Sequence, residues 1–277
     1  MPIVVVSTEW RAKQRWSCGR CEGRKSTRAA VSLARRNATL GETATPPPSW
    51  LDRTMFMRPR DIGLFLRSAR TDAKLARLRA EIGAAAAFDA VYAGGDPWES
   101  ANSRYLYQRR KYDMLASVLP VARVARALDL GCGVGLLTRR LLTRADDVLG
   151  LDISQAAVDQ ARTLHAGTPG LLFDQASVLD LPASLDGRFD IVTLADTLYY
   201  LPPPLEDRVF KTMATRVARL LAPGGVLLLA NHFFFAADPD SRLSRRIHRA
   251  FAWSPSFTVV SERRWPFYLT TLLEGAP

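Results

Sequence analysis

The sequence predicts an α/β protein in which helices cover both faces of a doubly wound, mostly parallel sheet. Three observations predict this fold. An apolar strand at 127–130 runs directly into a glycine-rich turn, 131–135, that opens a helix. A second strand, 189–195, is apolar almost throughout, as expected of a parallel strand buried on both faces. A Pro-Gly-Gly turn at 223–225 then leads into a further strand at 226–230.

The other elements follow from apolar spacing, capping residues and turn residues. Ser100 or Asn102 is expected to cap the helix that carries Tyr105 and Tyr112. Ser154 is expected to cap the helix that begins at Gln155. In chain order the sequence predicts one or two helices within 61–90, a helix over 155–165, a strand over 171–173, an amphipathic helix over 205–221, a basic helix over 238–251, and two last strands over 257–260 and 267–273.

The glycine-rich turn is suited to holding a ligand against bare backbone. Gly131 lets the chain turn sharply off the strand, Gly133 lets backbone approach a ligand, and Gly135 lets the next helix pack against the sheet. The next apolar strand ends at Asp152, where a carboxylate would accept hydrogen bonds from a ribose diol. Asp129 precedes the first glycine by two residues, and the short G-x-G-x-G spacing argues against a pyrophosphate and therefore against a dehydrogenase.

The positive charge of the chain is concentrated before this turn. The formal net charge is +11, yet residues 1–80 hold 17 Lys and Arg against six Asp and Glu, whereas residues 81–277 hold 21 of each. A protein that modifies nucleic acid would carry basic surface around its cleft, so a nucleic-acid substrate is disfavoured. The alternative, in which the basic segment serves as an electrostatic arm for nucleic acid, stays open.

The sequence divides into three parts: a basic, weakly ordered extension over 1–56, a helical lid segment over 57–84, and an α/β domain over 85–277. Natural translation could also begin at Met55 or Met57. Three cysteines favour a reducing compartment, and no apolar run is long enough to span a membrane, so a cytoplasmic protein is expected. Cys18 and Cys21 have the spacing of half a zinc site, but no second pair follows nearby, and no metal is predicted.

The chain resembles the class I S-adenosylmethionine-dependent methyltransferases. The resemblance rests on the stretch from Ala127 to Gly135, on Asp152 and on the L-x-P-G-G turn at 221–225. It implies a Rossmann-like seven-stranded sheet with an antiparallel seventh strand. The segment from Asp96 to Tyr112 looks more specifically like methyltransferases related to nodulation protein S, which methylate the free amine of a glucosamine-type oligosaccharide.

The resemblance implies S-adenosylmethionine as the cofactor and a set of residues around it. Trp98 would cover the cofactor and Arg109 would reach its methionine carboxylate. Ser177 stands where the superfamily usually has an aspartate for the adenine amino group, so this contact is weaker or is replaced by Asp180 or by backbone. The residues expected to bind the cofactor are Trp98, Arg109, Asp129, Gly131, Cys132, Gly133, Gly135, Asp152, Ile153, Ser177, Val178 and Asp196.

Acceptor chemistry is expected at the ends of strands 189–195 and 226–230. Asp196 would hold an ammonium acceptor and take its proton, while Tyr199 would shape the pocket. His232 is the alternative base, and for a hydroxyl acceptor the order reverses because a more basic group is needed. We therefore expect an enzyme that methylates a small molecule, most simply an amine such as an amino sugar. O-methylation of a secondary metabolite and a non-catalytic nucleoside-binding protein are the alternatives.

Overall fold

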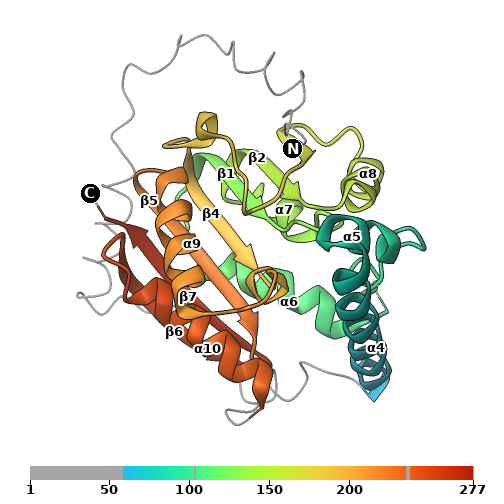
Figure 1. Ribbon diagram of the computed structural model, residues 1–277. Coiled ribbons are helices and arrows are strands. Elements are labelled where there is room, and N and C mark those ends of the chain that lie inside the picture. The colour runs from blue at the N-terminus through green and yellow to red at the C-terminus, as the bar shows by residue number, and fades with distance from the viewer. Residues whose placement is uncertain (1–58, 103, 235–237, 277) are drawn as a thin grey trace.

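The computed structural model describes residues 59–102, 104–234 and 238–276 (Figure 1). Their strands form a seven-stranded sheet in the order β3-β2-β1-β4-β5-β7-β6. The strands are β1 (Val124–Leu130), β2 (Ala145–Asp152), β3 (Leu171–Gln175), β4 (Phe189–Ala195), β5 (Leu221–His232), β6 (Phe257–Trp265) and β7 (Tyr268–Gly275). The extension predicted over 1–56 and the possible zinc ligands Cys18 and Cys21 lie outside the described residues.

The sheet is parallel except at one edge. Strands β1 to β5 pair in parallel, and β7 is inserted antiparallel between β5 and β6. The antiparallel register places Tyr268 directly opposite His232. This arrangement confirms the predicted doubly wound, mostly parallel, seven-stranded sheet, and it brings the carboxyl ends of β1, β2, β4 and β5 to a common edge.

Helices cover both faces of the sheet. They are α4 (Pro59–Ile82), α5 (Ala84–Tyr92), α6 (Leu106–Val118), α7 (Leu136–Leu141), α8 (Gln155–Leu164), α9 (Asp207–Leu220) and α10 (Pro239–Ala252), with short 3-10 turns η1 (Ala183–Leu185) and η2 (Leu198–Tyr200). Helices α9 and α10 pack on one face, in front of the sheet in Figure 1, and α6, α7 and α8 pack on the other.

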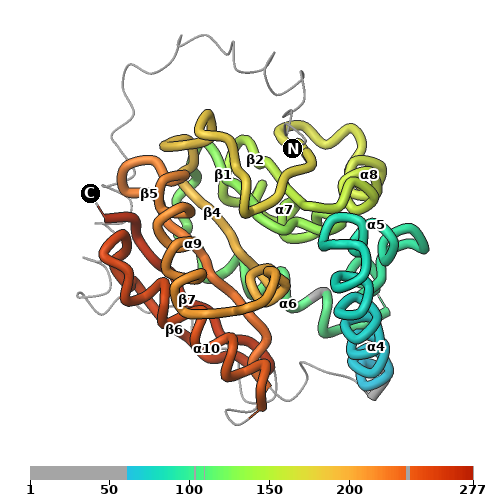
Figure 2. The backbone as a smooth tube through the Cα atoms, viewed as in Figure 1, coloured from blue at the N-terminus to red at the C-terminus, as the bar shows by residue number. Residues whose placement is uncertain are grey.

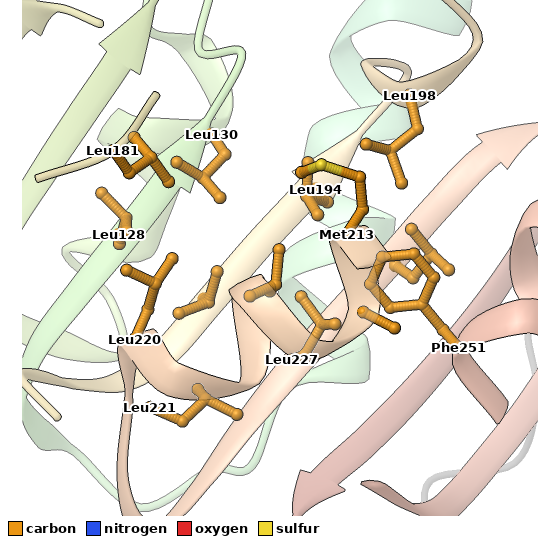
Figure 3. Packing of buried hydrophobic residues seen from close by; sticks show 14 of the residues in the cluster. Leu128, Leu130, Leu181, Leu194, Leu198, Met213, Leu220, Leu221, Leu227 and Phe251 are labelled. Carbon is orange, nitrogen blue, oxygen red and sulfur yellow. The ribbon is translucent and has the colours of Figure 1, made fainter. Parts of the chain in front are cut away.

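Alternate residues of each central strand fill the two cores. On β4, Ile191 packs into the cluster on the α6 side, while Val192 and Leu194 pack into the cluster on the α9 side. Figure 3 shows Leu194 beside Met213 of α9. Burying such a side chain contributes about 1.5–3 kcal/mol. Because both faces are covered, the strand has to be apolar throughout, which is the pattern that predicted it.

Helices α4 and α5 pack on each other and form a separate layer beside the sheet (Figure 2). Leu75 of α4 and Ala87 and Val91 of α5 form their shared apolar cluster, and α5 also packs on α8. They occupy the segment in which helices were expected. The division into a lid over 57–84 and a domain from residue 85 stays a prediction.

The structure confirms one local prediction and corrects others. Ser154 caps α8, because its side chain accepts a hydrogen bond from the Ala157 amide. Neither Ser100 nor Asn102 caps α6, whose N-cap is Tyr105; the Asn102 side chain instead closes a turn on the Arg104 amide. Strand β5 begins five residues early, because Leu221 already pairs with Phe189 before a bulge.

None of the helices in the described ranges has the length and apolar character needed to cross a membrane.

Candidate active site

A cavity of about 740 Å³ lies between the carboxyl edge of the sheet and helices α4, α5 and α6. Its size is within the range of small-molecule sites. Twelve of the predicted site residues line it: Trp98, Asp129, Gly131, Cys132, Gly133, Asp152, Ile153, Ser177, Val178, Asp196, Tyr199 and His232. Gly135 does not line it, and the side chain of Arg109 lies outside the described part of the chain.

The glycine-rich turn leaves β1 and begins α7. Gly131, Gly133 and Gly135 all have φ between +53° and +80°, a region that other residues adopt at a cost. A Cβ at Gly135 would collide with the Phe173 ring of β3. Gly135 therefore leaves room for the Phe173 ring, whereas Gly131 and Gly133 line the cavity.

Asp152 ends β2 and is held by backbone alone. Its Oδ2 accepts a hydrogen bond from the Gly133 amide at 2.8 Å and its Oδ1 accepts one from the Ser154 amide at 2.9 Å. The side chain is buried, and burial raises its pKa. A carboxylate has about four acceptor positions, so Asp152 retains acceptor capacity toward the cavity that it lines.

Asp129 joins three elements beneath the turn. It accepts hydrogen bonds from Thr138 Oγ1 at 2.7 Å and from Thr193 Oγ1 at 2.6 Å. Burial raises its pKa to about 6, although the two hydroxyls favour the charged form. Its bonds within the protein tie β1 to α7 and β4, so its first role is to fix the turn.

Trp98 and Ser177 both line the cavity and have separate partners. The Trp98 ring contacts Tyr92 and Tyr200, and its Nε1 donates to Asp72 of α4 at 3.2 Å. Ser177 closes its own turn by accepting from the Leu179 amide at 3.2 Å. Asp180, the alternative adenine contact, is exposed and does not line the cavity.

Asp196 follows β4 in the left-handed region, with φ +55°, which is rare for a residue with a Cβ and marks a constrained site. Its Oδ2 accepts from Lys111 Nζ at 2.8 Å and from the Tyr268 hydroxyl. Its Oδ1 is 2.8 Å from His232 Nδ1 and 3.1 Å from the His232 amide nitrogen. Burial alone would raise the pKa of Asp196, but His232 and Lys111 hold it far below its usual value.

His232 ends β5 with its ring oriented by Asp196. Because an ionised carboxylate only accepts, Nδ1 donates to Asp196, and in a neutral imidazole Nε2 would then carry the free electron pair. The contacts of Nε2 with the hydroxyls of Tyr107 and Tyr268 are long, at 3.5 and 3.4 Å. The His232 side chain is 30% exposed and lines the cavity. The pair therefore has the arrangement of an oriented general base.

Tyr199 lies against this pair. Its hydroxyl is 3.4 Å from His232 Nδ1, and its ring packs on Tyr200 with centroids 4.4 Å apart. Burial raises its pKa well above the ordinary value, and the Asp196 carboxylate raises it further. A phenol that stays protonated cannot be a base, so Tyr199 forms a wall of the site.

Sequence reasoning missed Lys111 and Tyr268. Lys111 lies one turn after Tyr107 on α6, which places both toward Asp196. Tyr268 reaches Asp196 because it stands opposite His232 in the sheet. A single lysine in the predicted helix did not indicate a role in the site. The pairing of Tyr268 with His232, 36 residues before it, cannot be predicted from the sequence pattern.

Residues 127–225, from β1 into β5, match a family model described as a methyltransferase domain. This part of the chain is a methyltransferase domain by sequence similarity. The ubiquinone biosynthesis O-methyltransferase of Dechloromonas aromatica is 36% identical over 107 residues, which are 38% of this chain and 43% of that protein. The O-methyltransferase rstn1 of Aspergillus nomiae is 32% identical over 146 residues, which are 50% and 60% of the two proteins.

The chain spans about half the length of the curated relatives it matches. A crystal structure of the N-methyltransferase NodS from Bradyrhizobium japonicum with S-adenosyl-L-homocysteine matches with a TM-score of 0.54, covering 66% of this chain and 93% of that one. At 18% identity this match shows the fold of the methyltransferase domain. Membership of the nodulation protein S family stays a prediction.

Proposed function

We propose that this protein binds S-adenosylmethionine and transfers its methyl group to a hydroxyl group of a small organic acceptor, with His232 as the general base. One observation carries the choice of acceptor: the carboxylate of Asp196 is already bonded to Lys111, Tyr268 and His232. The basic atom available at the cavity is therefore His232 Nε2, and a hydroxyl acceptor is the kind that needs such a base.

The residues on the nucleotide side of the cavity fit the cofactor. The spare acceptor positions of Asp152 suit a ribose diol, and the backbone of Gly131 and Gly133 permits close approach. Ile153, Ser177 and Val178 line the same region as Asp152 and suit the adenine. When bound, S-adenosylmethionine supplies an electrophilic methyl group on a sulfonium.

His232 makes a hydroxyl oxygen nucleophilic at the moment of transfer. Nε2 would take the acceptor proton, and bound S-adenosylmethionine would supply the methyl group that replaces it on oxygen. Asp196 stabilises the imidazolium that results through its bond to Nδ1. General base catalysis of this kind contributes about 10²–10⁴-fold, and alignment of the two reactants supplies much of the rest.

An amine acceptor is the second prediction, and the site supports it less. An ammonium group is best held by a carboxylate that has no other cation. Lys111 Nζ already stands 2.8 Å from Asp196 Oδ2, and the low pKa of Asp196 makes it a weak base. Relatives named O-methyltransferases also favour a hydroxyl.

The test is an acceptor screen with methyl-labelled S-adenosylmethionine. Purified protein is incubated with catechols, hydroxyquinones and aliphatic alcohols, and in parallel with amino sugars and primary amines. We expect label in products of the hydroxyl panel, and mass spectrometry locates the methyl group on oxygen. Calorimetry with S-adenosylmethionine, and with NAD as the control ligand, reports cofactor binding separately.

Label on nitrogen alone would overturn the hydroxyl assignment and restore the amine prediction. Binding of NAD without binding of S-adenosylmethionine would overturn the cofactor assignment as well. Binding of S-adenosylmethionine with no transfer to either panel would favour a non-catalytic nucleoside-binding protein.

A further inference from the structure

We propose that Lys111 is a positioning residue that sets the pH range over which His232 can accept a proton. Lys111 and His232 share the two oxygens of one carboxylate, so the charge of the lysine decides how strongly Asp196 holds a proton on the imidazole. The inference rests on the proposed role of His232 as base.

The shared carboxylate is shielded from solvent. Lys111 Nζ lies 2.8 Å from Oδ2, and His232 Nδ1 lies 2.8 Å from Oδ1. The side chains of Lys111 and Asp196 are 10% and 14% exposed. Lys111 Nζ also stands 5.1 Å from the ring centroids of Tyr112 and Tyr268. With water largely excluded, the interaction among these three groups is screened weakly.

Among the residues that the structure describes, the other titratable groups around His232 are phenols and carboxylates. Tyr107 of α6, Tyr199 of η2 and Tyr268 of β7 have raised pKa values, mainly because of burial, and stay neutral. Asp72 of α4 is a second carboxylate that interacts with His232, and burial raises its pKa. Asp240 of α10 lines the same cavity.

Lys111 keeps its charge in this setting. Burial alone would lower its pKa, but the Asp196 carboxylate raises it above the ordinary value. Lys111 and Asp196 thus form a neutral pair, and the imidazole can be neutral beside it. Without the lysine charge, a buried carboxylate would face the imidazole alone and would hold a proton on it.

The direct test is the titration of His232 by NMR in the ligand-free protein. The chain has three histidines, His165, His232 and His248, so histidine-selective ¹⁵N labelling gives few signals, and H232Q assigns one of them. The variants are K111M, which removes the charge, K111Q, which keeps a hydrogen-bond donor without charge, and K111R, which keeps both. His165, bonded to the Val134 carbonyl, is the internal control.

We expect K111M and K111Q to raise the titration midpoint of His232 by about one to two pH units, the usual effect of an adjacent unit charge. K111R should leave the midpoint close to that of the wild type, and His165 should not move in any variant. The double variant K111M/D196N should reverse the shift, since the carboxylate that holds the proton is gone. If K111M does not fold, K111Q and the double variant decide the matter.

Folded K111M or K111Q protein with an unchanged His232 midpoint would overturn the inference. A midpoint that rises equally in K111R would also do so, because charge would then not be the cause. This result is independent of turnover. If H232Q still transfers methyl groups while K111M shifts the midpoint, the proposed base is wrong but the role of Lys111 stands. If turnover depends on His232, the acidic limb of the rate profile in K111M should move up with the midpoint.

Discussion

Asp152 and Asp196 are two carboxylates that line the same cavity, at the carboxyl ends of β2 and β4. They differ in their hydrogen-bond partners and in the direction of their pKa shifts. Asp152 is bonded to the amides of Gly133 and Ser154, and burial raises its pKa. Asp196 is bonded to Lys111, Tyr268 and His232, and its pKa is far below the ordinary value. Asp152 is thus free to accept from a ligand, whereas Asp196 is committed to other side chains.

The contrast separates two ways of building a site. The Asp152 side is made from one β-turn-α unit and the strand beside it, so its parts are close in sequence. Backbone amides hold its carboxylate in place. The Asp196 side collects side chains from α6, β4, β5 and β7, which only the complete fold brings together. Binding of a common cofactor suits the first arrangement, and chemistry on a particular acceptor suits the second.

The largest effect is expected on the Asp196 side. H232Q should lower kcat for a hydroxyl acceptor by about 10²–10⁴-fold, the range for loss of a general base, while calorimetry shows unchanged affinity for S-adenosylmethionine. H165Q, which changes a histidine outside the cavity, is the matched control and should keep full activity. A large loss of cofactor affinity in H232Q would mean that the two sides are not separate.

The next largest effect is that of breaking the network around Asp196 on the stability of the protein. D196N leaves buried Lys111 without its counter-ion and should lower the free energy of unfolding by about 3–5 kcal/mol, as measured by urea unfolding. D113N breaks an exposed carboxylate–arginine pair, Asp113–Arg140, and should lower it by about 1 kcal/mol or less. Equal losses of stability in both variants would show that the buried ion pair around Asp196 matters no more than an exposed one.

On the other side, D152A should weaken binding of S-adenosylmethionine by about 1–3 kcal/mol, the scale for hydrogen bonds to a charged group. Calorimetry with the wild type measures this directly. D180A removes an exposed carboxylate that does not line the cavity and should leave the affinity unchanged. Should D152A bind as tightly as D180A, the ribose assignment fails.

The effect that is smallest at neutral pH concerns a histidine whose two hydrogen-bond partners are neutral. His248 is buried between Thr271 and Asn231, and burial lowers its pKa to about 3. As pH falls below about 6.5 the unfolded chain takes up a proton that the folded one does not, so stability should fall by about 1.4 kcal/mol per pH unit down to about pH 3. In H248Q this component should be absent.

Urea unfolding of the wild type and H248Q at pH 7, 6, 5 and 4 tests this prediction. The wild type should lose stability faster than H248Q at each step. Parallel pH profiles for the two proteins would show that His248 titrates alike in the folded and unfolded states. In contrast to H232Q, H248Q should transfer methyl groups at the wild-type rate at pH 7.

The sequence predicted the local parts of this molecule well. Strand β4 and the Ser154 cap of α8 follow from apolar runs and turn chemistry, which depend on neighbours in the chain. The cap of α6 was predicted wrongly, because Asn102 uses its side chain in a turn one step earlier. Capping patterns indicate that a helix begins but do not decide between adjacent polar residues.

The proximity of the glycine-rich turn to Asp152 could likewise be anticipated, since they end neighbouring strands and are close in the sequence. Their role in binding the cofactor stays a proposal. The roles of Lys111 and Tyr268 could not, because they depend on the packing of α6 and on the register of β5 with β7. Asp196 was predicted as a base, and its contact with His232 Nδ1 supports the proposal that it orients His232 instead.

His232 is proposed to remove the proton from a hydroxyl acceptor. The most direct measurement compares kcat of the wild type and H232Q over a series of substituted phenols with falling pKa, built on the best acceptor from the screen. A base is needed only while the acceptor is protonated, so the deficit of H232Q should shrink as the phenol pKa falls below the assay pH. A deficit of constant size across the series, or no deficit at all, would contradict the account.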